Sequence, residues 1–131
     1  AALRGIRMAS RLIREIIPLP HEAEGRRTLI YGAGDGGEMV LRELRKNVDW
    51  NLRPVGFIDD DPLKHGKLIN GLRVIDSNGS LEHICRDESI KAVLISSPKI
   101  DREALRRVRE FCNRSEIELL RAQMVIVPLT A

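Results

Sequence analysis

The most constraining feature of this sequence is a glycine-rich stretch between an apolar run and a helical pattern. Gly32-Ala33-Gly34-Asp35-Gly36-Gly37 follows the apolar residues 28–31 and opens the segment 35–47, where apolar residues recur at helical spacing. Strand, glycine-rich turn and helix in this order are typical of an α/β domain with a parallel sheet. The glycines therefore predict where the first strand of such a sheet ends.

The rest of the chain alternates between strand and helix patterns. Further strands are expected at 54–58, near 72–75, at 92–95 and at 117–120, and Met124–Val127 is a candidate for one more. A brief helix near 81–85 and a longer one capped by Asp101 lie between them. Such alternation implies right-handed crossovers with helices on both faces of the sheet. We therefore predict a Rossmann-like parallel sheet of about five strands within residues 27–131.

Residues 1–20 are expected to form a separate amphipathic helix. Arg4, Arg7, Arg11 and Arg14 recur three or four positions apart and share one face. Two interpretations stay open for this helix. It is either a packing or solvated helix, or a juxtamembrane stalk whose basic face meets anionic lipid.

Charge and composition argue against nucleic acid as a partner. Residues 1–17 carry a net charge of +3, whereas the remaining residues hold 18 basic and 18 acidic side chains. One Trp, one Tyr and two Phe are too few to stack the bases of a single strand. Cys85 and Cys112 lie far apart and the three histidines are scattered, so no metal site is predicted.

Each glycine of the motif has a physical task if the turn binds a diphosphate. Gly32 allows the tight turn, Gly34 lets a phosphate approach the backbone, and Gly37 lets the helix pack closely on the sheet. The diphosphate would then lie on the free N–H groups at the helix N-terminus. Asp59 stands 22 positions beyond Gly37, where an acid is expected to accept the ribose hydroxyls. The alternative is a glycine-rich turn that binds nothing.

The acidic run that follows residue 58 favours NAD or NADH over NADP. Asp59, Asp60 and Asp61 would repel a 2′-phosphate, and no arginine follows at once to receive one. We expect ligand contact first from Asp59 and second from Asp60. Some of these aspartates could serve only to form the turn before Pro62.

Two further groups of residues are expected near the same sheet edge. Ser96 and Ser97 follow the strand at 92–95 and either line the ribose or nicotinamide side or simply leave the strand. Lys64, His65 and Lys67 either reach a second anionic group or lie in a solvated loop.

No matched acid and base accompanies this predicted site. The acid–base pair of short-chain sugar-modifying enzymes is a tyrosine with a lysine four residues later. Here the only tyrosine is Tyr31, and Asp35 stands four positions on. We therefore expect a domain that binds without catalysing, and an oxidoreductase that holds its substrate at Ser96 and Ser97 is a less favoured reading.

Three stretches together resemble a known family. LIYGAGDGGEMVLREL, RPVGFIDDDPLKHGKLINGLRV and KAVLISSP are similar to the nucleotide-binding domain of bacterial membrane proteins of surface-polysaccharide synthesis. This family includes CapD-like nucleotide-sugar dehydratases and epimerases, and a similar module occurs in glycosyl-1-phosphate transferases acting on lipid carriers. The resemblance covers roughly residues 27–120.

The resemblance implies a Rossmann-like fold and a nucleotide ligand on the cytoplasmic face of a membrane. It carries ligand contact onto Gly32, Ala33, Gly34, Asp35, Gly36, Gly37 and Asp59, and it makes the first helix the stalk of a parent membrane domain absent from this chain. Catalysis would then belong to the parent protein.

Three functions remain open on this basis. The leading one is a regulatory or structural NAD(H)-binding domain. The second is a site for a UDP-sugar that feeds the parent enzyme. The third is an interaction module with a vestigial cleft, whose first helix would contact a second copy of the chain in a homo-oligomer.

Overall fold

The computed structural model describes residues 25–77, 81–96 and 99–130. They form a Rossmann-like sheet of six strands in the order β3-β4-β2-β1-β5-β6. Neighbouring strands run parallel except at the β3–β4 pair, which is antiparallel. The strands are β1 (Arg26–Tyr31), β2 (Leu52–Asp59), β3 (Leu68–Ile69), β4 (Leu72–Asp76), β5 (Ala92–Ile95) and β6 (Glu118–Arg121).

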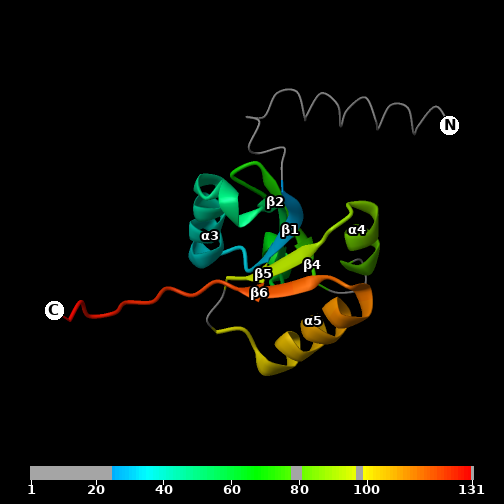
Figure 1. The fold of residues 1–131 in the computed structure, drawn as a ribbon. Helices are drawn as coiled ribbons and strands as arrows, with labels where there is room; N and C mark the ends of the chain where they lie inside the picture. The colour runs from blue at the N-terminus through cyan, green and yellow to red at the C-terminus, as the bar shows by residue number, and fades with distance from the viewer. Residues whose placement is uncertain (1–24, 78–80, 97–98, 131) are drawn as a thin grey trace.

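Helices cover both faces of this sheet, as predicted. Helix α3 (Asp35–Lys46) lies on one face, and α4 (Leu81–Asp87) and α5 (Arg102–Ser115) lie on the other (Figure 1). Two short 3₁₀ turns, η1 (Val48–Trp50) and η2 (Pro62–Lys64), flank β2. The fold class expected from the sequence is confirmed.

The central strand β1 contributes side chains to a separate core on each face. Ile30 packs with Leu41, Leu44 and Phe57 beneath α3. Its neighbours Leu29 and Tyr31 point the other way, into the cluster that α4 and α5 cover. Because successive side chains of a strand alternate between faces, a continuous apolar run is what a strand covered on both sides requires.

The sheet contains one strand, β3, that was not predicted from the sequence. Leu68 and Ile69 pair with Arg73 and Leu72 in a short antiparallel hairpin. Asn70 and Gly71 connect them with φ values of 50° and 85°. Two consecutive left-handed residues form the turn that suits a two-residue hairpin, and Asn-Gly is its preferred sequence. That dipeptide was the available signal.

The suggestion of a further strand at Met124–Val127 is wrong. Residues 122–130 have no regular secondary structure and extend away from the domain (Figure 1). Ile126 is 89% exposed and Leu129 is 97% exposed. Their composition suits a strand, but within the described residues no neighbouring strand pairs with them.

The predicted N-terminal helix at 1–20 lies outside the described residues. Within residues 25–77, 81–96 and 99–130, none of the helices combines the length and the apolar character that a membrane span requires.

Candidate functional site

The glycine-rich turn lies where the strand order of the sheet changes direction. Strand β1 pairs with β2 on one side and with β5 on the other. The chain leaves β1 at its carboxyl end, enters the turn, and begins α3 at Asp35. In open α/β sheets, ligands bind beyond the carboxyl ends of the strands at this switch point. The fold thus exposes the turn at the edge that such domains use.

The first and last glycines of the motif hold the turn against the sheet. Gly32 has a φ of 114°, in the left-handed region, and its N–H donates to the carbonyl oxygen of Ile58 over 2.7 Å. A Cβ atom on Gly37 would stand 1.9 Å from the carbonyl oxygen of Gly32 and 3.2 Å from Cε1 of Phe57. The predicted close approach of helix and strand at Gly37 is confirmed.

Gly34 differs from them because it is not crowded. It is the N-cap of α3 and has no side chain to cover the first N–H groups of the helix. A Cβ atom built on it would have a single heavy atom within 4 Å, the Nζ of Lys64 at 3.8 Å. The N-terminus of a helix carries free N–H donors and a partial positive charge, which together favour an anion. The backbone at Gly34 is therefore open to a phosphate.

Asp59, at the end of β2, is bonded to this turn. Its Oδ2 accepts the N–H of Ala33 over 2.8 Å, and its Oδ1 accepts the N–H of Asp61 over 2.8 Å. Burial alone would raise the pKa of Asp59, but these two N–H groups and the ammonium of Lys64 hold that pKa below its usual value. Beyond these two bonds each carboxylate oxygen has a further acceptor position, and the ammonium of Lys64 faces that of Oδ2 at 3.7 Å. A charged acid thus stands beside the turn and can still accept ribose hydroxyls.

Asp60, the second expected contact, is engaged elsewhere. Both oxygens of its carboxylate accept the hydroxyl of Tyr31 at 2.8 Å, and Oδ1 also accepts the hydroxyl of Ser77. These bonds join the ends of β1, β2 and β4. Asp59 is accordingly better placed than Asp60 to meet a ligand.

The same bonds make Tyr31 a sensitive probe of the fold, because it is the only tyrosine in the chain. Burial, the hydrogen bond to Asp60 and the charge of Asp60 together raise the pKa of Tyr31 far above its usual value of 10.0. A raised folded-state pKa stabilises the fold at pH values below the unfolded pKa, and this contribution is lost as the pH climbs toward the folded pKa. We expect the phenolate absorbance of the folded protein to stay flat through that usual value and to rise only with alkaline unfolding.

A titration in denaturant provides the reference, because unfolded Tyr31 should ionise near about pH 10. In the variant Asp60→Asn the ionisation should move to lower pH, since the negative charge is lost and one of the two acceptor oxygens is replaced by an NH₂ donor. Ionisation of the native protein near pH 10, with its circular dichroism unchanged, would contradict this description.

The serines expected at this edge are only partly described. Ser96 follows β5 and is 9% exposed, and its hydroxyl donates to the carbonyl oxygen of Tyr31 over 2.9 Å. A Cβ atom on Gly36 would lie 3.2 Å from the carbonyl oxygen of Ser96. Ser96 therefore closes the β5 side of the turn. Ser97 lies outside the described residues.

The three basic residues after the acidic run take different positions. The ammonium of Lys64 is 3.7 Å from Oδ2 of Asp59 and stands over Gly34. The Nε2 atom of His65 is 2.7 Å from the carbonyl oxygen of Asp59, and Lys67 is exposed. Of the three, Lys64 alone reaches the turn within the described residues.

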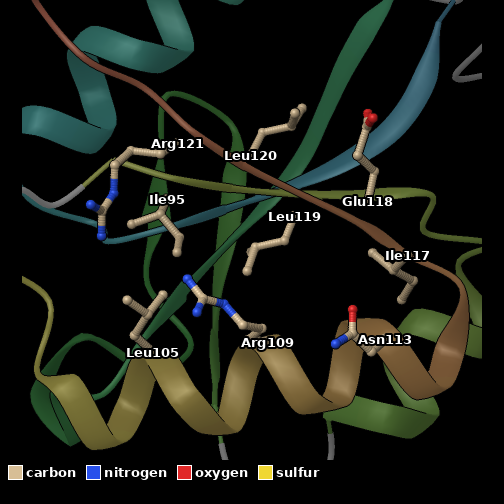
Figure 2. Close-up of a pocket in the computed structure, with 9 residues that line it drawn as sticks. All are labelled: Ile95, Leu105, Arg109, Asn113, Ile117, Glu118, Leu119, Leu120 and Arg121. Atoms are coloured by element: carbon tan, nitrogen blue, oxygen red, sulfur yellow. The ribbon is translucent and has the colours of Figure 1, made fainter.

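The surface also has two open hollows, the first of which reaches the turn through Asp35. One, of about 390 Å³, is lined by Asp35, Glu38, Arg42 and Asn70 beside α3. The other, of about 500 Å³, lies between α5 and β6, and in Figure 2 Leu105 and Arg109 extend from α5 toward the sheet, on the side of Ile95. The second hollow could not be predicted from the sequence, because this hollow forms only when α5 packs beside the last strand.

Residues 25–77, 81–96 and 99–130 contain no group of three His, Cys, Asp or Glu side chains that could hold a metal ion. Cys85 and Cys112 are buried free cysteines. Burial raises the pKa of Cys85 to about 12, with a contribution from Cys112, and burial raises that of Cys112 to about 11. Both thiols therefore stay protonated near neutral pH.

Comparison with known proteins agrees with this geometry. A family described as a CoA-binding domain matches residues 2–120. The chain is 32% identical over 118 residues to the probable polysaccharide biosynthesis protein EpsC of Bacillus subtilis (strain 168). The matched region covers 90% of this chain and 20% of EpsC. It is 27% identical over 118 residues to the capsular polysaccharide biosynthesis protein CapD of Staphylococcus aureus, covering 89% of this chain and 20% of CapD.

Solved structures share the fold. The UDP-D-quinovosamine 4-dehydrogenase from Vibrio fischeri superimposes with a TM-score of 0.66 at 27% identity, covering 76% of this chain and 79% of that one. RSP in complex with β-NADH superimposes with a TM-score of 0.61 at 18% identity, covering 81% of this chain and 50% of that one. At this identity the second match bears on the fold alone.

Proposed function

We propose that this chain, which belongs to the CoA-binding domain family, binds NAD or NADH at the turn between β1 and α3 without catalysing a reaction itself. The observation that supports this proposal is the open backbone face of Gly34 at the N-terminus of α3. Asp59 lies beside it, bonded to the N–H of Ala33. A diphosphate fits the first feature and a ribose fits the second. The remaining motif residues, including Gly36, would shape the cradle through their backbone.

Asp59 favours NAD(H) within the dinucleotide class. NADP and coenzyme A each carry a phosphate on the ribose, and a charged carboxylate with a lowered pKa opposes a phosphate there. Proteins of this fold accommodate NAD, since RSP was solved both with β-NADH and with β-NAD⁺ and operator DNA. We propose Ser96 and Ser97 for the nicotinamide side of the site.

The state of Tyr31 supports a regulatory or structural role rather than a catalytic one. The phenol of Tyr31 is buried, and its proton is held by Asp60. A group with so raised a pKa is a poor proton donor near neutral pH. We propose that NAD(H) bound within residues 27–131 serves a parent protein in this regulatory or structural role.

The parent is proposed to act in polysaccharide biosynthesis on the cytoplasmic face of a membrane. The chain is homologous to part of EpsC and CapD and spans about one fifth of the length of each. The basic residues of segment 1–20 support a role as the stalk that joins this domain to the membrane part.

A UDP-sugar is the second candidate ligand. The Vibrio fischeri relative carries a UDP-sugar in its name and is 27% identical. A diphosphate at a helix N-terminus serves a UDP-sugar as well as a dinucleotide. In that case the domain would hold the sugar nucleotide for the parent enzyme.

Thermal melting of the chain with separate ligands distinguishes these candidates. NAD, NADH, NADP, coenzyme A and UDP-sugars are added in parallel, each at the same excess. At about 100 times the dissociation constant a ligand stabilises the fold by about 2.7 kcal/mol, which raises the midpoint by roughly 10 °C. We expect the shift with NAD or NADH. A shift with UDP-sugars alone would transfer the function to substrate handling, and no shift with any of them would contradict nucleotide binding.

A further inference from the structure

The backbone of Lys64 is held in a fixed position beside the glycine-rich turn. Lys64 is the last residue of η2, which Asp61 caps by accepting the N–H of Leu63 at 3.0 Å. The N–H of Lys64 donates to the carbonyl oxygen of Asp61, also at 3.0 Å. This short turn follows directly from the end of β2, so the root of the Lys64 side chain is fixed relative to Asp59.

The ammonium of Lys64 occupies the approach to Gly34. It lies 3.7 Å from Oδ2 of Asp59 and 3.8 Å from the point where a Cβ atom of Gly34 would stand. Among residues that are not neighbours of Gly34 in the chain, no other atom lies within 4 Å of that point. A cation thus stands over the backbone of Gly34, and the side chain that carries it is 36% exposed.

We propose that Lys64 contacts the diphosphate of the bound nucleotide and leaves Asp59 to do so. This inference rests on the proposed function of the turn. In the free protein Lys64 neutralises Asp59. A diphosphate on the helix N-terminus carries more negative charge than one carboxylate and accepts charge-assisted hydrogen bonds from an ammonium. Once Lys64 has moved, the vacant acceptor position on Asp59 is available to a ribose hydroxyl.

Asp59 does not need Lys64 to keep its position. The N–H groups of Ala33 and Asp61 bind its two oxygens from the backbone on either side. The exchange of partners by Lys64 therefore leaves the acid anchored. Lys64 becomes a specificity residue that selects nucleotides with a diphosphate over nucleosides, while Asp59 recognises the sugar.

Three variants at two neighbouring lysines isolate this role. Lys64→Gln removes the charge, Lys64→Arg retains it, and Lys67→Gln removes an exposed charge from the same loop as the matched control. Each full chain is titrated with ADP and with adenosine, which differ only in the diphosphate, and with NAD. We expect Lys64→Gln to weaken ADP and NAD binding about tenfold and to leave adenosine binding unchanged. Lys64→Arg and Lys67→Gln should bind all three like the original chain.

The outcomes separate this inference from the proposed function. If the original chain binds NAD and Lys64→Gln binds it equally well, the inference is wrong and the proposed function stands. Equal losses of ADP and adenosine would also overturn it, because Lys64 would then act through the loop or Asp59. Failure of the original chain to bind NAD or ADP would reject the proposed function itself.

Discussion

Gly37→Ala should be the most destabilising single substitution in the turn. The added methyl group would stand 1.9 Å from the carbonyl oxygen of Gly32, a distance that requires the backbone of α3 or β1 to shift. Phe57 blocks the alternative direction, since its Cε1 lies 3.2 Å from the same point and its side chain is fully buried. We expect a loss of about 3 kcal/mol or more in the free energy of unfolding.

Chemical denaturation of Gly37→Ala against the original chain measures this loss, with Gly34→Ala as the matched control. If Gly37→Ala does not fold while the control does, the loss of stability is larger still, and the prediction is supported. A loss below about 1 kcal/mol would mean that helix and strand can separate cheaply here, contrary to the geometry.

Gly34→Ala should have the opposite profile, with a folded protein that no longer binds its ligand well. Gly34 has a φ of −96°, which alanine adopts without strain, and a Cβ atom there meets only the mobile ammonium of Lys64. Stability should fall by less than about 1 kcal/mol, the cost of replacing glycine by alanine at an N-cap. The methyl group would, however, occupy the approach of the diphosphate to the backbone.

The expected loss in affinity is about 2 kcal/mol, or roughly 30-fold, because at least one hydrogen bond to a charged phosphate is broken. Calorimetric titration of NAD into Gly34→Ala measures it, with circular dichroism as the check on folding. Wild-type affinity in this variant would show that the ligand does not approach Gly34, and the site would have to be sought elsewhere.

Much of the fold could be predicted because its signals are local. The apolar run 28–31 is buried on both faces, and β5 at Ala92–Ile95 behaves in the same way. Asp101 caps α5 as expected, since its side chain accepts the N–H of Ala104. Gly37 could be assigned a packing role because the motif requires a close approach at that position.

The missed features depend on contacts between distant segments. The bond between Asp60 and Tyr31 could not be foreseen, because the two residues are 29 positions apart and are brought together only by the pairing of β1 with β2. Met124–Val127 has the composition of a strand, yet a strand also needs a partner. Lys64 was one of three equivalent basic residues in the sequence, and only the course of η2 distinguishes it.

The most direct test of the proposed site is to follow the backbone amide resonances of the chain while NAD is added. If the ligand lies on the turn, the largest changes should fall on Gly34, Asp35 and Gly36 at the start of α3, with further changes at Asp59. Changes confined to the hollow between α5 and β6 (Figure 2), or none at millimolar NAD, would contradict the account.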